Sequence, residues 1–257
     1  MDNRFSLDFF RLDGKVAIVT CWNTVIGMAY AEALSTAGAD LLVTTIDDNI
    51  NEVKEIVEGL GRKIVFVKGD LTKEECREEV ISKCLEEYSK IDILVNNAGT
   101  IRRAPLLEYK EEDWQAVMDI NLNAVYHLSQ KVAKILVEQK SGKIINIASM
   151  LSFQGGKFVP PYTASKHGVA GLTKAFANEL AVHNVQINAI APGYIATANT
   201  APIRADENRN NEILSRIPCG RWGQVEDLMG TVVFLASKAS DYVNGHILAV
   251  DGGWLVR

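Results

Sequence analysis

The sequence predicts an α/β protein, a single doubly wound domain whose seven-stranded parallel sheet is flanked by helices on both faces. Seven short apolar runs rich in β-branched residues recur along the chain, and longer segments of helical period separate them. The runs are nearly continuous rather than alternating, which is typical of strands buried on both faces. No Pro-rich or Gly-rich linker divides the 257 residues, so we expect one domain over 1–257, with 1–11 as an N-terminal extension.

The predicted elements follow in chain order. The strands are Val16–Thr20, Leu41–Thr45, Ile64–Val67, Ile91–Val95, Ile144–Ala148, Val185–Ile190 and Ile247–Val250. Helices are predicted where apolar residues recur at intervals of three and four, in Glu74–Tyr88, Glu112–Gln139, Tyr162–His183 and Gln224–Ala236. The segment Glu112–Gln139 is long enough for two helices in succession. In such folds ligands bind outside the carboxyl ends of the strands, where every motif described below falls.

Composition and charge exclude several classes of partner. The net charge of −5 leaves no basic face that would neutralise many phosphates, so nucleic acid is not expected. No apolar run approaches a membrane span, and the N-terminal stretch lacks the apolar core of a signal peptide. The four cysteines and four histidines lack metal-ligand spacing. We expect a cytoplasmic protein with reduced thiols, no metal and no membrane contact.

The strongest chemical signal is Tyr162-Thr-Ala-Ser-Lys166 within a helical segment. A spacing of four residues places the phenol and the ammonium on one face, so both can act on one substrate. A free tyrosine has a pKa of about 10, and lowering it by roughly 2–3 requires about 3–4 kcal/mol. A lysine charge about 4 Å away supplies about that much at an effective dielectric of 20. Alone, such a pair is more often two surface residues.

Two further polar residues support the catalytic interpretation. Ser149 ends the predicted strand Ile144–Ala148, where a hydroxyl can hydrogen-bond a reacting carbonyl, and the alternative is a turn-forming serine. Asn121 lies within a helical segment, where asparagine is unfavourable. It therefore has either a specific hydrogen-bonding task or a local backbone contact.

The whole set resembles the short-chain dehydrogenase/reductase family from about residue 12 to the C-terminus, through Asn96-Asn-Ala-Gly99, Asn121, Ser149, Tyr162, Lys166 and Pro192-Gly193. The resemblance implies a Rossmann-type oxidoreductase with a nicotinamide cofactor, and a homotetramer, as is usual in the family. Tyr162 is implied as general acid/base, Ser149 as the partner of the carbonyl, and Asn121 as the seat of a proton-relay water. Lys166 is implied to hold the nicotinamide ribose and to lower the pKa of Tyr162.

The same resemblance implies the cofactor site. Asn97 and Gly99 shape the pocket, Asp70 meets the adenine, and Thr197 holds the carboxamide or a phosphate. The full set of implied cofactor-binding residues is Thr20, Asn23, Thr24, Ile26, Gly27, Asp47, Asp70, Leu71, Asn97, Ala98, Gly99, Tyr162, Lys166, Pro192, Gly193, Ile195 and Thr197.

The segment after the first strand departs from the family pattern Thr-Gly-x-x-x-Gly-x-Gly, whose glycines let a pyrophosphate approach a helix N-terminus. This chain reads Thr20-Cys-Trp-Asn-Thr-Val-Ile-Gly27, so only the third glycine remains, and a positive φ at Val25 would be strained. The protein is therefore either a cofactor-impaired, non-catalytic member of its fold, or its loop shifts slightly and still presents its N–H groups. The intact catalytic set favours the second interpretation.

Charge near the end of the second strand favours NAD(H) over NADP(H), because a carboxylate there takes the ribose hydroxyls and an arginine takes a 2′-phosphate. The usual acidic position holds Thr45, but Asp47 and Asp48 lie close by. No Lys or Arg occurs in 20–27 or 44–50. We expect NAD as the cofactor.

Several stretches resemble the family's 2-dehydro-3-deoxy-D-gluconate 5-dehydrogenases, which act in the breakdown of uronates from pectin or glycosaminoglycans; they include Ile101-Arg-Arg103, Ser149–Gly156 and Gly220-Arg-Trp-Gly223. The resemblance implies interconversion of 2-dehydro-3-deoxy-D-gluconate and 3-deoxy-D-glycero-2,5-hexodiulosonate. Gluconate 5-dehydrogenase activity is the nearest alternative, because one pocket contact decides between them. An anionic substrate needs fixed cations. The expected substrate-binding residues are Arg102, Arg103, Ser149, Gln154, Tyr162 and Arg204.

Overall fold

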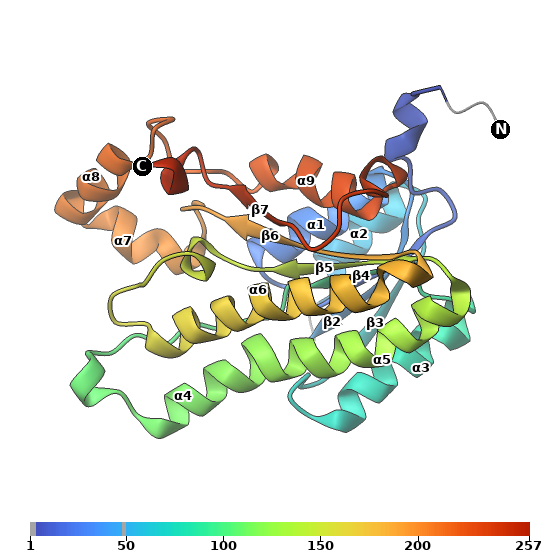
Figure 1. Ribbon diagram of the computed structural model, residues 1–257, viewed down its shortest axis with the longest axis horizontal. Coiled ribbons are helices and arrows are strands. Elements are labelled where there is room, and N and C mark those ends of the chain that lie inside the picture. The colour runs from blue at the N-terminus through green and yellow to red at the C-terminus, as the bar shows by residue number, and fades with distance from the viewer. Residues whose placement is uncertain (1–3, 48–49) are drawn as a thin grey trace.

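The computed structural model describes residues 4–47 and 50–257, and a seven-stranded, all-parallel sheet forms the centre of this part (Figure 1). The strand order is β3-β2-β1-β4-β5-β6-β7, which reverses direction between β1 and β4, and this confirms the predicted fold class. The strands are β1 (Val16–Val19), β2 (Asp40–Thr45), β3 (Ile64–Lys68), β4 (Ile93–Asn96), β5 (Gly142–Ile147), β6 (Val185–Pro192) and β7 (Ile247–Val250).

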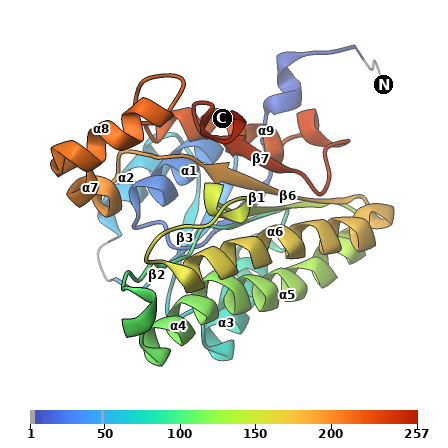
Figure 2. The ribbon, with the colours of Figure 1, turned by 60° about the vertical axis from the view of Figure 1, so that its left-hand side comes forward.

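Helices cover both faces of the sheet, and each face has its own apolar core (Figure 2). Along β1, Ala17 and Val19 pack toward α1, α2 and α9, whereas Val16 and Ile18 pack toward α3 and α5. This alternation explains why β1 is apolar at every position. The helices are α1 (Val25–Thr36), α2 (Asn51–Gly59), α3 (Glu74–Tyr88), α4 (Glu111–Met118), α5 (Ala124–Gln139), α6 (Pro160–Leu180), α7 (Ala201–Ala205), α8 (Glu207–Arg216) and α9 (Glu226–Ala236).

The predicted segment Glu112–Gln139 is indeed two helices, and they follow one another without a break. A π-helical stretch over Asp119–Asn123 joins α4 to α5 and contains Asn121. Single π turns inside α-helices occur frequently at functional sites, because the wider turn re-aims the side chains that it carries. Asn121, which is unfavourable in a regular α-helix, therefore lies where the helix is in fact irregular.

Other boundaries shift by a few residues. Strand β4 begins two residues later than predicted, at Ile93, and β5 begins two residues earlier, at Gly142, where pairing with Val185 of β6 extends the ladder. Helix α6 begins at Pro160, because proline is favoured in the first turn, where its missing N–H costs nothing. It ends at Leu180, and a short 3₁₀ turn completes the predicted segment to His183.

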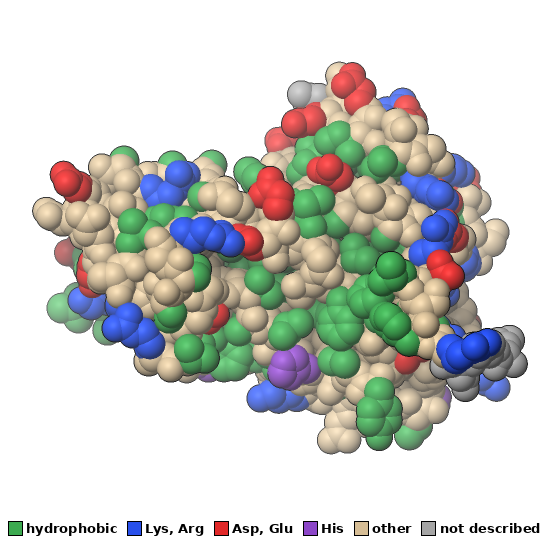
Figure 3. All heavy atoms as spheres, turned by 90° about the horizontal axis from the view of Figure 1, so that it is seen from above, with side chains coloured by type: hydrophobic (Ala, Val, Ile, Leu, Met, Phe, Trp, Pro, Cys, Tyr) green, Lys and Arg blue, Asp and Glu red, His purple; other side chains and the backbone are tan. Residues whose placement is uncertain are grey.

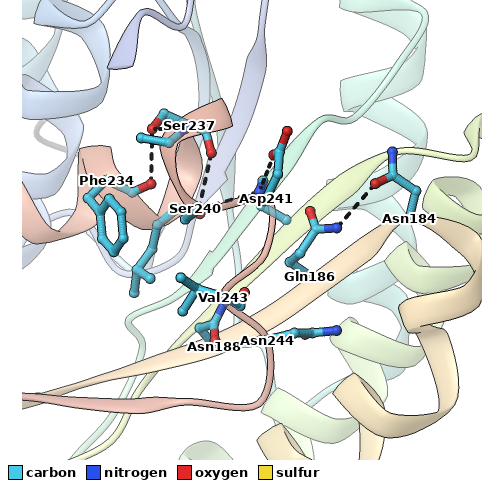
Figure 4. Close-up of polar contacts among 12 residues, drawn as sticks. Asn184, Gln186, Asn188, Phe234, Ser237, Ser240, Asp241, Val243 and Asn244 are labelled. Atoms are coloured by element: carbon cyan, nitrogen blue, oxygen red, sulfur yellow. Dashed lines mark hydrogen bonds and ion pairs between the residues drawn. The ribbon is translucent and has the colours of Figure 1, made fainter. Parts of the chain in front are cut away.

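Side-chain amides complete the edge of β6 where no strand pairs with it (Figure 4). Strand β7 pairs only with Ala189–Pro192. Before that point, Asn188, 1% exposed, donates to the carbonyl of Val243 at 2.7 Å and accepts from the N–H of His246 at 2.9 Å. The loop after Ser240 is thereby fixed to the sheet, because both partners of Asn188 belong to it.

We predict that Asn188→Leu lowers the free energy of unfolding by about 2–6 kcal/mol, because two buried backbone groups lose their partner at about 1–3 kcal/mol each. The measurement is urea unfolding followed by far-UV circular dichroism. Asn199→Leu is the control, since Asn199 is exposed. Equal stabilities of the two variants would show that the amide bonds do not hold this edge.

Candidate active site

The carboxyl ends of four neighbouring strands meet at one edge of the sheet. Parallel pairing sets Val19 opposite Val95, Asn96 opposite Asn146, and Ile147 opposite Ile190. The residues that come next in the chain therefore share this edge, as the sequence predicted. They are Thr20 after β1, Asn97 after β4, Ser149 after β5 and Gly193 after β6.

Ser149 and Tyr162 lie near one another at this edge, and the side chain of Ser149 lowers the pKa of the Tyr162 phenol. Ser149 is 8% exposed and caps a short 3₁₀ helix, where its hydroxyl accepts from the N–H of Leu151 at 3.1 Å. Tyr162 lies half-buried in the first turn of α6. The hydroxyl of Ser152 donates to the carbonyl of Lys166 at 2.7 Å and so ties the segment after β5 to α6. The segment that carries Ser149 and the helix that carries Tyr162 are thus tied together at this edge.

Lys166 lies one helical turn beyond Tyr162 and is 6% exposed. Its Nζ lies 5.5 Å from the centre of the Tyr162 ring and donates to the carbonyl of Ile147 at 2.5 Å. Burial lowers the pKa of Lys166 to about 8, because the charged ammonium has little water around it. A group with this pKa exchanges protons readily near neutral pH.

The pKa of Tyr162 is raised, so the predicted lowering by Lys166 is wrong for this arrangement. Burial is the largest cause, and the hydrogen bond with Ser149 and the positive charge of Arg103 lower the pKa by less. The ammonium of Lys166 is hydrogen-bonded to Ile147 rather than to the phenol. Tyr162 is therefore protonated at neutral pH and is suited to donate a proton.

Asn121 is completely buried and uses its amide to join three segments. Its Oδ1 accepts from the N–H of Thr100 at 2.8 Å, and its Nδ2 donates to the carbonyl of Thr100 at 2.9 Å and to Ser165 Oγ at 3.2 Å. Gly99 lies directly against it, since a Cβ there would be 3.2 Å from Asn121 Oδ1. The predicted hydrogen-bonding task of Asn121 is confirmed.

The loop after β1 is bound to the end of β4. Thr20 Oγ1 accepts from the N–H groups of Asn97 and Ala98 at 2.9 Å each, and Asn97 Nδ2 donates to the carbonyl of Cys21 at 2.8 Å. A Cβ on Gly27 would lie 2.4 Å from the Cys21 carbonyl oxygen, which is closer than any side chain allows. This contact explains why the third glycine of the loop remains.

The strained position of the loop is Cys21, not Val25. Cys21 takes φ 55°, a left-handed conformation that glycine adopts more easily, whereas Val25 begins α1 and is 48% exposed. Thr24 caps α1 by accepting from the N–H of Gly27 at 3.0 Å. Within 4–47 and 50–257, the N–H groups of Val25 and Ile26 have no hydrogen-bond partner. Free N–H groups at a helix N-terminus fit a pyrophosphate.

An acidic side chain lies close to this loop. Cys21 Sγ donates to Asn23 Oδ1 at 3.2 Å, and Asn23 Nδ2 donates to the carboxylate of Asp47, two residues beyond β2. Asp48 lies outside the described residues. The pairing of β2 with β3 places Lys68 opposite Thr45, so this end of the sheet also carries a cation that the sequence analysis did not count.

The remaining predicted cofactor residues lie at the same edge. Asp70 and Leu71 follow β3, and Asp70 Oδ1 accepts from the N–H of Thr72 at 2.9 Å. A Cβ on Gly193 would lie 2.5 Å from the Asp251 Cα, so the chain after β6 needs a glycine here. The predicted residues beyond it are Ile195, which is buried and bridges to Gly223, and Thr197, which caps a 3₁₀ turn.

The three predicted substrate arginines have different surroundings. Arg102 pairs with Asp113 at 3.5 Å, and Arg204 donates to the carbonyl of Thr197 at 3.1 Å. Arg103 is exposed, and its charge reaches the phenol of Tyr162. Of the three, Arg103 is therefore the one whose charge acts on the catalytic edge. Gln154 lies half-buried just after the 3₁₀ turn of Ser149.

Sequence reasoning missed Tyr194. Its ring packs edge-on against Trp222 and Trp254, and the charge of Arg103 reaches its phenol as well. The available signal was its place directly after Pro192-Gly193, at the end of a strand whose neighbour, β5, is followed by Ser149.

The charge of the surface agrees with the composition. On the face in Figure 3, Lys and Arg side chains are interspersed with Asp and Glu and form no continuous basic area. Within the described ranges, no three potential metal ligands gather in one place, and no helix has the length and apolarity to cross a membrane.

Comparison with known proteins decides the family. The family described as "Enoyl-(Acyl carrier protein) reductase" matches residues 23–255. The 2-dehydro-3-deoxy-D-gluconate 5-dehydrogenase of Bacillus subtilis (strain 168) is 56% identical over 250 residues, which are 97% of this chain and 98% of that protein. The chain belongs to the short-chain dehydrogenase/reductase family. The protein of the same name from Escherichia coli (strain K12) is 52% identical over 252 residues, 98% of this chain and 99% of that protein.

A solved structure of the same short-chain dehydrogenase/reductase family has nearly the same fold. It is a gluconate 5-dehydrogenase from Burkholderia cenocepacia J2315 in complex with NADP and tartrate, 37% identical, with a TM-score of 0.94. The match covers 98% of this chain and 100% of that one. The predicted family and fold are thus confirmed, and the chain is an oxidoreductase of a family that uses pyridine nucleotides.

We predict that glycine at positions 21 and 25 improves the affinity for NADH by less than about threefold, or roughly 0.6 kcal/mol. Cys21 already adopts the glycine-like φ, and Val25 lies in an ordinary helical turn. The measurement compares the dissociation constant of Cys21→Gly/Val25→Gly with that of the unchanged protein by NADH fluorescence titration. A large gain in affinity would show that the altered loop impairs the cofactor site.

The pKa of Lys166 predicts a pH dependence of stability. Folding lowers this pKa from 10.5 to about 8, so between these values the unfolded chain binds more protons, and stability rises with pH. At 1.36 kcal/mol per pH unit, Lys166 contributes a rise of about 3 kcal/mol across this window. Urea unfolding at pH 7.5 to 10.5 should show this rise relative to Lys166→Met. A constant difference between the two proteins would contradict it.

Proposed function

We propose that this protein is an NADH-dependent oxidoreductase that interconverts the C5 ketone of 3-deoxy-D-glycero-2,5-hexodiulosonate and the C5 alcohol of 2-dehydro-3-deoxy-D-gluconate. The observation that carries the proposal is the geometry around Tyr162. It lies one turn before the buried Lys166, whose Nζ is 5.5 Å from the Tyr162 ring, on a helix that Ser152 ties to the segment of Ser149. The names of the Bacillus subtilis and Escherichia coli relatives support the substrate. The reaction belongs to the breakdown of uronates from pectin or glycosaminoglycans.

The chain's own residues divide the proton chemistry. When bound, the dinucleotide supplies or accepts the hydride. Ser149 hydrogen-bonds the carbonyl oxygen, and Tyr162 donates a proton to it as negative charge develops. Lys166 Nζ returns a proton toward Tyr162, because its pKa of about 8 suits exchange near neutral pH. Asn121 holds Thr100 and Ser165 in place and seats the relay water beside them.

The cofactor site is assigned to the loop after β1 and its neighbours. The free N–H groups of Val25 and Ile26 hold the pyrophosphate, and Asp47 takes the ribose hydroxyls and repels a 2′-phosphate. NADP in the Burkholderia cenocepacia structure and Lys68 beside β2 make NADPH the cofactor to test in parallel. The residues assigned to the adenine and nicotinamide ends are Asp70, Leu71, Asn97, Ala98, Gly99, Pro192, Gly193, Ile195 and Thr197.

Two further assignments accompany this proposal. Gluconate 5-dehydrogenase activity is the second candidate, supported by the name of that solved structure. The two substrates differ at C2, which is a ketone in one and an alcohol in the other, and at C3, which lacks a hydroxyl in the 3-deoxy compound. A single contact at these carbons can decide the preference. We also propose a homotetramer in the cytoplasm, as is usual for the family.

The test adds the hexodiulosonate to protein with NADH and follows the nicotinamide absorbance band. We expect NADH to be consumed, and Tyr162→Phe to lower kcat by about 10²–10⁴-fold with NADH affinity unchanged, because only the proton donor is lost. Tyr242→Phe is the control, since Tyr242 is fully exposed.

Each result decides one part of this proposal. Full activity in Tyr162→Phe would refute the assigned acid. Turnover of D-gluconate with NAD, without turnover of the hexodiulosonate, would replace the first substrate by the second candidate.

A further inference from the structure

We propose that Tyr194 and Arg103 form the subsite for the substrate's carboxylate, so that Tyr194 is a specificity-determining residue. The inference rests on the proposed function, because it names how the same site recognises a sugar acid. It concerns a residue that lies one strand away from Ser149 and takes no part in the proton chemistry.

The chain brings Tyr194 to the catalytic edge. The N–H of Ala148 donates to the carbonyl of Ile190 at 2.7 Å, so the ends of β5 and β6 lie side by side just before Ser149 and Tyr194. Met150, next to Ser149, belongs to the same apolar cluster against which Tyr194 packs. In Figures 1 and 2, α7, α8 and the first turns of α6 lie at this same end of the molecule.

Two tryptophans fix the direction of the Tyr194 ring. Trp222 lies 5.4 Å away at 81° and Trp254 lies 4.8 Å away at 67°, both edge-to-face. Each tryptophan is itself held, since Trp222 Nε1 donates to Asn210 Oδ1 at 2.7 Å and the guanidinium of Arg216 stacks on Trp254 at 4.0 Å. Trp222 and Trp254 are 8% and 3% exposed. A ring between such neighbours holds its hydroxyl in one direction.

The Tyr194 hydroxyl is available to a ligand. Tyr194 is half-buried, and its hydroxyl has no hydrogen-bond partner among residues 4–47 and 50–257. Burial raises the pKa of Tyr194, so the phenol is a neutral donor at neutral pH. A half-buried donor without a partner gains most from an acceptor that arrives with the substrate.

The charges around this hydroxyl favour an anion. The positive charges of Arg209, Arg216 and Arg103 lower the pKa of Tyr194, and the negative charge of Glu212 raises it. Glu212 pairs with Arg209, which leaves Arg103 and Arg216 as the excess positive charge. An arginine beside a phenol donor matches a carboxylate, which accepts hydrogen bonds on both oxygens.

The same arginine connects this subsite to the reacting end. Arg103 lowers the pKa of both Tyr162 and Tyr194, so its charge reaches both phenols. In the hexodiulosonate the carboxylate carbon lies four bonds from C5. In the proposed subsite, a substrate with its C5 oxygen at Tyr162 has its carboxylate at Tyr194, because the ends of β5 and β6 lie side by side.

The first experiment measures Tyr194→Phe, which keeps the aromatic packing and removes only the hydroxyl. We expect KM for the hexodiulosonate to rise about 10–100-fold, as for a lost hydrogen bond to a charged group. We expect kcat to change less than about threefold, because the reacting atoms are untouched. Tyr242→Phe is again the control. An unchanged KM in Tyr194→Phe, with an active parent protein, overturns the inference and leaves the proposed function intact.

A second measurement separates carboxylate recognition from a structural role. With the methyl ester of the substrate, the KM of Tyr194→Phe should exceed that of the parent protein by a much smaller factor than with the acid, because the ester carbonyl accepts only a neutral hydrogen bond. A KM that rises equally for acid and ester would overturn the inference.

If the parent protein turns over none of the substrates, binding is measured instead of turnover. Calorimetric titration of D-gluconate into NADH-loaded protein should then still show weaker binding in Tyr194→Phe and Arg103→Met. Equal binding in the parent and both variants overturns the subsite. Inactivity of the parent protein on every sugar acid, by contrast, refutes only the proposed function.

Discussion

The site depends on the way in which the two neighbouring strands β4 and β5 are aligned with helix α6. Inside the protein, Asn96 Nδ2 donates to Asn146 Oδ1 at 2.8 Å, and Asn146 Nδ2 donates to Thr173 Oγ1 at 2.9 Å. These buried amides fix the alignment of the two strands with α6, because a shift of one element along another would leave the amides without hydrogen-bond partners. Lys166 then reaches the carbonyl of Ile147 at the end of β5. The meeting of Tyr162 with Ser149 follows from this alignment.

The loop after β1 shows how a departure from a family pattern can keep its geometry. The conformation that a glycine adopts easily is held here by Cys21, whose carbonyl oxygen accepts from Asn97 Nδ2. A left-handed non-glycine residue costs of order 1 kcal/mol, and the bonds around it offset that cost. Gly27 cannot be replaced in this way, because its Cβ would overlap backbone atoms. The chain therefore keeps Gly27, where a side chain would overlap the backbone. The other glycines of the family pattern, which no steric contact requires, are replaced by other residues.

Most of the fold and of the candidate site could be predicted from the sequence, because strands buried on both faces are mostly apolar and the Tyr162–Lys166 spacing places both side chains on one helix face. The boundaries at Ile93 and Gly142 depend on pairing with neighbours, which a single segment does not encode. The raised pKa of Tyr162 depends on its burial and on the hydrogen bond of Lys166, whose ammonium donates to the carbonyl of Ile147 and not to the phenol. The sequence places Tyr194 directly after Pro192-Gly193, but its surroundings could not be predicted, because they come from segments far apart in the chain.

The central claim is that this edge of the sheet binds a nicotinamide dinucleotide despite the altered loop. Calorimetric titration of the unmodified protein with NADH, and in parallel with NADPH, tests it most directly. We expect saturable binding with one site per chain and a higher affinity for NADH, because the carboxylate of Asp47 would repel a 2′-phosphate. Binding of neither dinucleotide would contradict the account and would make the protein a silent member of its family.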